Sequence, residues 1–476
     1  ISAIIEPKWI SRYFRMMGQQ SAQQNALFYE FCLDKHIPKN HLLRQVDQFI
    51  DFDQVRAHLK PFYSHTGRPS IDPELMIRML LVGYCYGIRS ERRLCDEVNY
   101  NLAYRWFCNL GLEDEIPNHS TFSKNRLGRF RDADLLRHIF NAVVQRCVEE
   151  GLVGGEGFAV DASFVKAHTS KKQRVKGHTD WKPVIKQTRA VKEYFEALDS
   201  VPALNRHQGT ISLTDPMAQW TAAKGTANFF YSTNYLVDVK SIVIMDVEAS
   251  PSTHNLEVLT TKSMIQRVED NHNITPDYLL GDTAYGASAN LNFVVNEKGI
   301  EPYIPVWDKS NRKDDRFSIA DFTWDESRDE YRCPAQKSLR KKRRKEKVPT
   351  PLVTKENTVT YRSLRKDCKT CTLKKYCCPQ THGRIISRSI YESARETARR
   401  NCSSDEYRRI YLDERKKVEM SFAHMKQHLG FSKLRLRGLK SANDEFLLVA
   451  IAQNLKKLAM YCGPPLFESR ISPPIV

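Results

Sequence analysis

Apolar positions recur with helical spacing over about the first 150 residues of the chain. In IDPELMIRMLLVGYCYG, Asp72 is expected to cap a helix, a proline follows at the first helical position, and Gly87 marks the end. Further short helices are predicted from Ser90 and from Asn118. Short helices joined by tight turns indicate a helix-turn-helix DNA-binding domain or a plain helical bundle, and both interpretations stay open.

The helical pattern gives way at Gly155 to alternation with a period of two. GFAVDASFV is predicted to be a strand, and NYLVDVK and SIVIMDVEAS are predicted to form a hairpin. HNLEVLTTKSMIQRVED has the pattern of an amphipathic helix, and DYLLGDTAYGA that of a strand ending in a turn. Strands followed by a helix–strand unit favour a mixed sheet in an α/β domain.

Neither periodicity holds from residue 308 to 400. This stretch contains the polar DKSNRKDDRF, the charge run KSLRKKRRKEK and four clustered cysteines, so we interpret it as an irregular insertion. Helical periodicity returns near Tyr407 and continues to about Tyr461. The predicted organisation begins with a helical domain that binds DNA, residues 1–150. An α/β core follows in two parts, residues 151–325 and 386–462, with a basic cysteine-rich insertion, residues 326–385, between them. Residues 463–476 are predicted to be a flexible tail.

The net charge of the chain indicates the kind of partner that it binds. The chain has 74 Lys and Arg against 56 Asp and Glu, a net charge of +18, which favours an anionic polymer such as nucleic acid over a basic surface without a partner. There is no run of about 18 apolar residues, so no membrane span is expected. Twelve cysteines without a secretory signal favour a reducing, cytoplasmic location, and five of them are expected in helical cores: Cys32, Cys85, Cys95, Cys108 and Cys147.

Two aspartates stand where predicted strands end. Asp161 ends FAVD, and Asp282 ends YLLGD. Site residues of α/β domains often lie at such positions. An aspartate there can also simply cap a turn, and for either residue alone that alternative is the commoner one.

The segment RKKVEMSFAHMKQHLG carries a third acid in basic surroundings. From Arg415 to Lys440 there are eight Lys or Arg residues and one carboxylate, Glu419. At 100° per residue, Arg415, Glu419 and Lys426 lie within about 40° of one another on a helix. A separate apolar stripe is expected to be the buried face: Val418, Phe422, Met425 and Leu429.

A metal site explains the retained acid better than a salt bridge does. An Arg-before-Glu pair on a helix contributes only a few tenths of a kcal/mol. Carboxylates are the ligands of hard cations, and two Mg²⁺ or Mn²⁺ ions roughly 4 Å apart can promote phosphodiester cleavage. The bases in this segment, Arg435 and Arg437 among them, would then hold DNA phosphates. Three further acids compete for a site role: Asp215, Asp238 and Asp246.

These motifs resemble those of the DDE transposases of bacterial insertion sequences, over residues 40 to 460. FAVDASFVKAHTSK resembles the first-aspartate motif and LLGDTAYGA the second, which implies Asp161 and Asp282 as catalytic. The third motif, Tyr-x-x-Arg-x-x-x-Glu followed after six residues by Lys, is matched by Arg415, Glu419 and Lys426. Its tyrosine is not matched, because Tyr411 stands one position too early and Leu412 occupies the place.

The resemblance implies a ribonuclease-H-like core, with Glu419 on a helix packed against the sheet and the long second spacer holding an inserted subdomain. It implies an enzyme that uses two Mg²⁺ or Mn²⁺ ions to cleave transposon ends and join them to target DNA, working as a homo-oligomer on double-stranded DNA in the nucleoid. His254, in STHNLEVL, is a candidate for supporting the metal ligands. The alternatives are a catalytically silent DNA-binding derivative and a stand-alone Mg²⁺-dependent nuclease.

The clustered cysteines fit a structural zinc site. Cys333 precedes a proline, and Cys368-x2-Cys371-x5-Cys377 follows, with Cys378 adjacent and His382 as a substitute ligand. Four thiolates bind Zn²⁺ tetrahedrally, and zinc would staple an insertion too small for its own hydrophobic core. The alternative is a set of free cysteines. The neighbouring run KSLRKKRRKEK is expected to grip DNA phosphates or to be a solvated loop.

Overall fold

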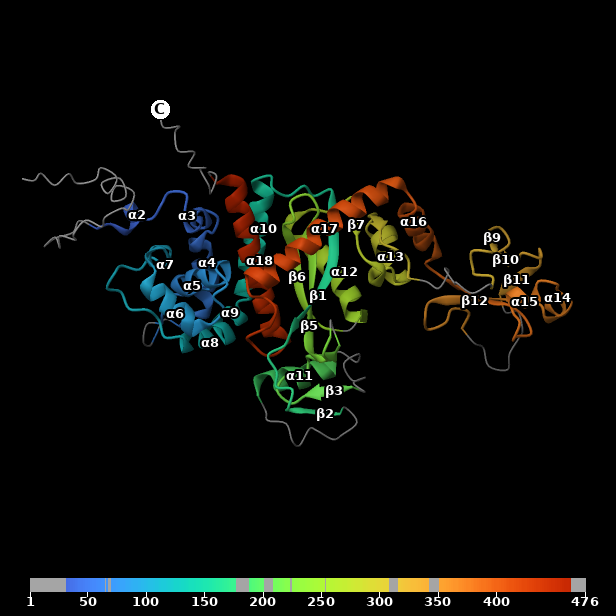
Figure 1. Ribbon diagram of the computed structural model, residues 1–476, viewed down its shortest axis with the longest axis horizontal. Helices are drawn as coiled ribbons and strands as arrows, with labels where there is room; N and C mark the ends of the chain where they lie inside the picture. The colour runs from blue at the N-terminus through green and yellow to red at the C-terminus, as the bar shows by residue number, and fades with distance from the viewer. Residues whose placement is uncertain are drawn as a thin grey trace, which may run out of the picture.

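The structure is a computed structural model that describes residues 31–463 apart from 65, 67–69, 177–187, 201–208, 223–224, 253, 308–315 and 342–350. Three parts follow one another along its longest axis (Figure 1). Helices α2 to α10 stand at one end, a mixed sheet with its helices lies in the middle, and a second, smaller sheet lies at the other end.

The N-terminal part is helical, as predicted. The Asp72 side chain accepts a hydrogen bond from the Glu74 N–H, and Gly87 has a φ of +70° that ends the helix. Cys85, Cys108 and Cys147 are buried here as expected, whereas Cys32 is exposed. The elements are α2 (Leu33–His36), α3 (Leu42–Asp47), α4 (Phe52–Leu59), η1 (Lys60–Phe62), α5 (Pro73–Cys85), α6 (Glu91–Tyr100), α7 (Leu102–Phe107), α8 (Ser120–Leu127), α9 (Arg129–Asp132) and α10 (Leu135–Glu149).

The central sheet has the order β4-β5-β1-β7-β8, with β6 also paired to β5. The β5–β6 and β1–β5 pairs are antiparallel, and β1–β7 and β7–β8 are parallel, so the predicted hairpin and mixed sheet are confirmed. The strands are β1 (Gly157–Lys166), β4 (Gln219–Thr221), β5 (Asn228–Asp238), β6 (Ile244–Pro251), β7 (Tyr278–Leu280) and β8 (Glu301–Tyr303).

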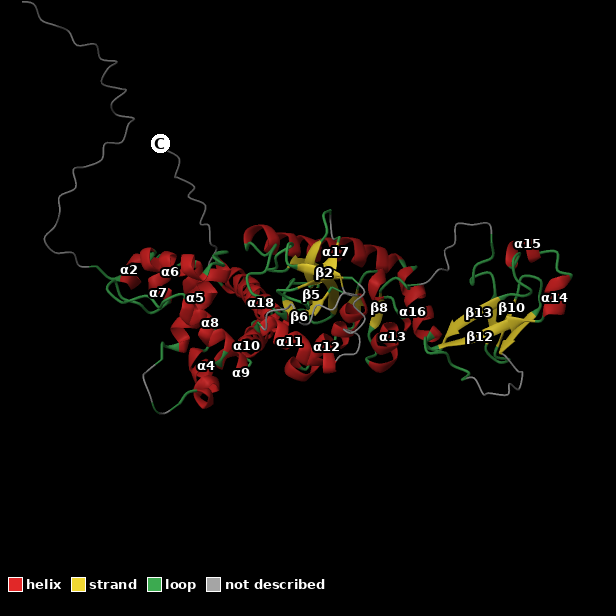
Figure 2. Cartoon of the chain, turned by 90° about the horizontal axis from the view of Figure 1, so that it is seen from below, coloured by secondary structure: helices red, strands yellow, loops and turns green. Residues whose placement is uncertain are grey.

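Helices cover this sheet on both sides. Figure 2 shows α17 (Asp405–His428) above the strands and α12 (His254–His272) below them. The remaining elements are a two-stranded ribbon and short helices: β2 (Arg174–Lys176), α11 (Arg189–Ser200), β3 (Thr210–Ser212), η3 (Thr283–Tyr285), α13 (Ser288–Asn292) and η4 (Phe293–Glu297).

The cysteine-rich insertion is a folded sheet, not an irregular segment. Its five strands are antiparallel in the order β13-β12-β11-β10-β9, and two short helices follow β12. It has a hydrophobic cluster of its own, so the expectation that it cannot build a core is wrong: Phe322, Tyr331, Leu339, Val359, Tyr361 and Ile386. The elements are β9 (Thr323–Asp325), β10 (Glu330–Arg332), β11 (Ser338–Lys341), β12 (Thr358–Ser363), α14 (Arg365–Lys369), α15 (Lys374–Cys377) and β13 (Ile385–Ser389).

The C-terminal part returns to the central sheet through α16 (Glu392–Cys402) and then consists of two long helices, α17 and α18 (Leu439–Cys462). The predicted single periodic run from Tyr407 to Tyr461 is therefore interrupted. Gly430 and Gly438 have φ values of +62° and +88°, which ordinary helical residues do not adopt, and they flank the break.

One hydrophobic core connects the helical part to the central sheet. A single cluster of buried side chains includes Leu43 and Met79 of the helical part together with Phe158 of β1 and Phe446 of α18. Helix α18 lies between the two parts and contacts α3, α5, α10 and β6. Across the described ranges, no helix is both long and apolar enough to cross a membrane.

Candidate active site

Asp161 and Asp282 lie side by side. Strand β1 pairs in parallel with β7 up to the pair Ala159–Leu280. Asp161 comes two residues after Ala159, and Asp282 comes two residues after Leu280. Neighbouring strands are about 4.8 Å apart, so this register puts both carboxylates on the same face of the sheet, near the C-terminal end of β7. Both line a cavity of about 20 Å³ together with Arg415. Asp282 stands beyond the end of β7, but Asp161 stands inside β1, which continues to Lys166, so the prediction that Asp161 ends its strand is wrong.

Burial makes the Asp161 carboxyl a weaker acid than an ordinary aspartate. Its pKa is raised to about 6, chiefly by desolvation, and the nearby charges of Asp282 and Glu419 contribute to this increase. The Ala162 N–H, which donates to Asp161 Oδ1 over 2.8 Å, and the charge of Arg415 act in the opposite direction. The site therefore holds acids in a place where an additional cation would be stabilising.

Helix α17 lies over this part of β1 as the sequence pattern predicts. Ser404 caps its start by accepting a hydrogen bond from the Tyr407 N–H over 3.1 Å. The predicted apolar stripe is buried: Val418, Phe422, Met425 and Leu429. The Phe422 ring stacks at 4.8 Å on Tyr235, the residue of β5 that pairs with Asp161. The contact fixes the helix above the aspartates.

Arg415 stands between the aspartates and Glu419. Its Nε donates to Glu419 Oε1 over 2.9 Å, and a second hydrogen bond runs to the Tyr411 hydroxyl. The Glu419 side chain is 56% exposed and does not line the cavity of the two aspartates. Tyr411 does line it, although it misses the family spacing, because four residues separate it from Arg415 on one helix face. That four-residue spacing was the sequence signal for Tyr411.

Lys426 reaches the same strand two helical turns further on. Its Nζ donates to the Ser163 hydroxyl over 2.5 Å, and Ser163 follows Asp161 by two residues on the same face of β1. Arg435 and Arg437 lie beyond α17 and are exposed. Arg437 donates to the His168 carbonyl over 2.9 Å. Arg415, Glu419 and Lys426 thus share one face of α17, which lies above β1.

The competing acids have internal partners. Asp215 accepts from the Tyr231 hydroxyl and the Gly438 N–H, at 2.6 and 3.0 Å. Asp238 accepts the Gly155 N–H over 3.0 Å and the Ser241 N–H over 2.8 Å. Asp246 pairs with Arg137 at 2.5 Å and with Arg267 at 2.7 Å. These carboxylates hold loops and helices together. The His254 side chain lies outside the described part of the chain.

The donor chemistry at the aspartates suits a hard divalent cation, since partly buried carboxylates are its preferred ligands. The Arg415 guanidinium balances their charge. Among the described residues, no three His, Cys, Asp or Glu side chains are arranged as a group that could hold a metal ion.

The cysteines of the insertion are partly gathered. Burial and the neighbouring thiol of Cys378 raise the pKa of Cys377 to about 12, and burial and the thiol of Cys368 raise that of Cys378. Cys368 lies 3.1 Å from the Ser363 hydroxyl, and Cys333 accepts the Lys337 N–H over 3.3 Å. The four predicted ligands, which include Cys371, do not form a metal-holding group in the described residues. Of the basic run, residues 342–347 lie outside them.

Two family models match the chain. A transposase domain (DUF772) matches residues 31–127, and a transposase DDE domain matches residues 332–459. The first covers most of the helical part. The second covers most of the insertion together with α16, α17 and most of α18, and therefore includes Glu419. The chain belongs to the DDE transposases of insertion-sequence type, whose function is DNA transposition and whose partner is DNA.

Proposed function

We propose that this transposase cleaves DNA at transposon ends and joins the freed ends to target DNA, with Asp161, Asp282 and Glu419 as its catalytic carboxylates. The observation that carries the proposal is the register of β1 and β7, which brings Asp161 and Asp282 together from positions 121 residues apart in the sequence. Above them, α17 presents Arg415, Glu419 and Lys426 on a single face.

The sheet supports a ribonuclease-H-like catalytic core. The first aspartate stands on β1 at the centre of the sheet, the second follows the adjacent parallel strand β7, and the glutamate stands on a helix packed against β1. The resemblance of the sequence motifs implies the same three locations. Two distant aspartates and a helix meet in this arrangement, and each comes from a different segment of the chain.

Asp161 and Asp282 would hold the Mg²⁺ or Mn²⁺ ions, and Glu419 would join them once its pair with Arg415 opens. Bound there, the ions would activate the attacking oxygen and stabilise the leaving oxygen of a phosphodiester. The cavity of about 20 Å³ has room for about one water molecule, so Arg415 has to move for a hydrated ion to enter. The released guanidinium would remain beside the site as a donor to phosphate oxygens.

Lys426 and Ser163 would position the DNA backbone next to the scissile bond. The Lys426 ammonium stands over β1 within 2.5 Å of Ser163, two residues from Asp161. An ammonium there can bind a phosphate oxygen and neutralise part of its charge. Further along, Arg435 and Arg437 are exposed and extend the basic surface away from the carboxylates. The basic side chains thus bind the polymer, and the acids take part in the chemistry.

The test is an assay with labelled transposon-end DNA and Mg²⁺, in which joined products, cleaved products alone or a gel shift alone separate the three functions. Joined products are expected for the wild type. Cleavage alone would indicate a nuclease, and a shift alone a catalytically silent DNA-binding protein. Glu419→Gln is expected to lose at least about a hundredfold in rate, since an ion ligand is removed, while most DNA binding remains.

A matched control is available on the same helix. Glu414 pairs with Lys417 at 2.9 Å, as Glu419 does with Arg415, but at five residues' distance it lies about 140° from Glu419 around α17. Glu414→Gln is therefore expected to keep wild-type cleavage. Unchanged cleavage by Glu419→Gln, or an equal loss in both variants, would show that Glu419 has been assigned wrongly.

A further inference from the structure

The segment between α17 and α18 carries exposed basic side chains along a path of turns and bends. Here the basic strip means residues 431–437. Lys433, Arg435 and Arg437 are exposed, whereas Phe431 and Leu434 are buried and anchor the strip in the core. On one flank the strip pairs with the end of β1, where the Leu434 N–H donates to the Lys166 carbonyl over 2.8 Å. The catalytic strand therefore holds only one flank of the strip.

The helical part holds the other flank. Arg89 lies in the turn between α5 and α6, 341 residues before Gly430, and its Nη1 donates to the Gly430 and Lys433 carbonyls over 2.9 and 2.7 Å. Its Nη2 pairs with Glu445 of α18. A planar guanidinium is suited to binding several acceptors in fixed directions. One side chain of the helical part thus contacts two backbone carbonyls between α17 and α18 and a side chain of α18.

Glu445 completes the connection. Its Oε1 accepts the backbone N–H groups of Arg435 and Leu436 over 2.8 and 2.7 Å, and its other oxygen pairs with Arg89. The Glu445 side chain is fully buried and that of Arg89 is 5% exposed. A buried ion pair with these extra hydrogen bonds fixes geometry more strictly than an apolar contact of the same size.

The turn that carries Arg89 is fitted closely to the core. Gly87 has a φ of +70°, and a Cβ atom there would lie 3.0 Å from the His428 carbonyl at the end of α17. Ten of the thirteen residues of α5 are buried. The turn between α5 and α6 therefore faces α17 and the strip.

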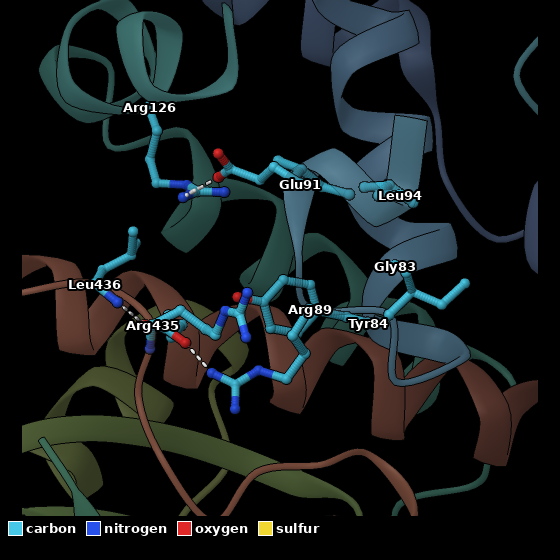
Figure 3. A pocket seen from close by; sticks show the side chains of 11 residues that line it. Gly83, Tyr84, Arg89, Glu91, Leu94, Arg126, Arg435 and Leu436 are labelled. Carbon is cyan, nitrogen blue, oxygen red and sulfur yellow. Dashed lines mark hydrogen bonds and ion pairs between the residues drawn. The ribbon is translucent and has the colours of Figure 1, made fainter. Parts of the chain in front are cut away.

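Around the ion pair the interface is not completely filled. A cavity of about 150 Å³ lies between the helical part and the strip, and both charged and apolar side chains line it, among them Arg89, Arg435, Glu445 and Leu94. Arg126, which also lines the cavity, forms a 2.7 Å pair with Glu91 (Figure 3). Phe431 and Leu434 pack into the core, and on the side of the cavity the polar contacts of Arg89 and Glu445 hold the backbone of the strip.

We propose that the helical part is a positioning element for the basic strip: Arg89 and Glu445 hold residues 431–437 so that Lys433, Arg435 and Arg437 bind consecutive phosphates of DNA. The contribution of the strip to DNA binding rests on the proposed function. The inference that Arg89 and Glu445 order the strip does not depend on the proposed function. Arg89 and Glu445 are positioning residues and do not themselves contact DNA.

The first experiment measures order without DNA. In the double variant Arg89→Met/Glu445→Gln no buried charge is left alone, and the introduced amide keeps an oxygen for the two N–H groups. Hydrogen exchange at residues 430–437 is expected to be at least tenfold faster than in the wild type, with unchanged exchange in β1 and β5. Unchanged exchange in the strip would overturn the proposal. Equal acceleration in β5 would too, because it would show general destabilisation.

The second experiment measures the salt dependence of binding to a double-stranded DNA oligonucleotide. Each lost phosphate contact lowers the slope of log affinity against log salt by about 0.9. Arg435→Ala/Arg437→Ala is expected to lower it by about 2, and the Arg89/Glu445 double variant by about 1 to 3. This slope does not depend on the fraction of molecules that are folded. Combining both pairs of substitutions should add little, because they act on the same contacts.

Arg93→Met/Glu97→Gln is the matched control, since it removes an ion pair of the same two residue types on α6, where Arg93 is 69% exposed, and leaves the net charge unchanged as the Arg89/Glu445 variant does. Its slope is expected to differ from the wild type by less than that of the Arg89/Glu445 variant. An equal change would mean that the loss of any ion pair in this region, and not the position of Arg89 and Glu445, is responsible. If Arg435→Ala/Arg437→Ala leaves the slope unchanged, the proposed DNA contacts are wrong, while the exchange result still decides whether Arg89 and Glu445 order the strip.

Discussion

The helical part and the cysteine-rich insertion are joined to the same central sheet in different ways. Side chains of the helical part belong to one hydrophobic cluster with β1, β5 and α18. The insertion has a separate cluster, and its described junction with α16 is polar, with Arg388 paired to Glu396 at 3.3 Å. Two parts that are both covalently joined to the central sheet can therefore differ in whether they share its hydrophobic core and unfold with it.

This difference defines which parts fold together. A shared core cannot lose one side without exposing the other, because burial of apolar area is the main stabilising term. A unit with its own core and a polar junction can unfold or be removed separately. The helical part is thus a structural component of the catalytic unit, and the insertion is an accessory to it. Four predictions test this contrast, in order of their expected effect on the main body.

Removal of the helical part should have the largest effect. A chain starting at residue 151 exposes the face of α18 that contacts α3, α5 and α10. We expect it to be insoluble or to lack a cooperative unfolding transition by circular dichroism. Replacing residues 309–391 with a flexible Gly/Ser linker should instead leave a soluble protein with cooperative unfolding. The comparison is broken if the shortened chain folds normally or if the linker variant does not fold.

Single core substitutions should separate the two units. Phe446 lies in the shared cluster and is fully buried, and Leu339 is fully buried in the insertion. Phe446→Ala should destabilise the main body by about 3–5 kcal/mol, because it loses transfer energy and leaves a cavity. Leu339→Ala should cost about 2–5 kcal/mol in the insertion alone. Scanning calorimetry is expected to show two transitions, each moved by one variant; a single transition shifted by both would contradict two units.

The charge of Asp161 should reduce the stability of the main body at neutral pH. Its folded pKa of about 6 is above the usual value of 3.8, so its contribution to stability is complete below about pH 4 and is lost as the pH rises through about 6. At most about 3 kcal/mol is involved. Asp161→Asn should therefore raise the midpoint of the main transition above about pH 6 while abolishing cleavage. Identical midpoints of both proteins across this range would refute the assignment.

Removal of zinc should leave the main transition unchanged. If thiolates of Cys333, Cys368, Cys371 and Cys377 hold a metal, a chelator should lower only the midpoint of the insertion, since these residues lie in it. Cobalt substitution should produce thiolate charge-transfer bands in the visible spectrum. Their absence, together with a chelator that changes neither transition, would leave these residues as free cysteines.

Local patterns in the sequence predicted what depends on neighbours along the chain. The strand around Asp161, the 244–251 hairpin partner and the buried stripe of α17 follow from periods of 2 and 3.6. The strands of the insertion did not stand out, because they are three to six residues long and lie among charges. The interruption after α17 was also missed, and two glycines eight residues apart were its only signal.

Contacts between distant segments could not be predicted. Arg89 and Glu445 are 356 residues apart, and nothing near either residue identifies the other as its partner. The cavity shared by Asp161 and Asp282 depends on the β1–β7 register, which the sequence suggests only through its resemblance to a family. The pairing of Glu419 with Arg415 was foreseen as the alternative to metal binding, and the structure contains this pair.

The short ladder between β1 and β7 limits which changes in length the gene can accept. Only three residue pairs define it, and the two aspartates follow at the same step on both strands. Adding or deleting one codon between residues 278 and 282 would turn the second acid to the opposite side of the sheet. An in-frame change of the same size between residues 273 and 276 would fall in the loop between α12 and β7 and leave this register unchanged. Copies of the element damaged by small frame-preserving indels should therefore tolerate them very unequally at sites fewer than 40 residues apart.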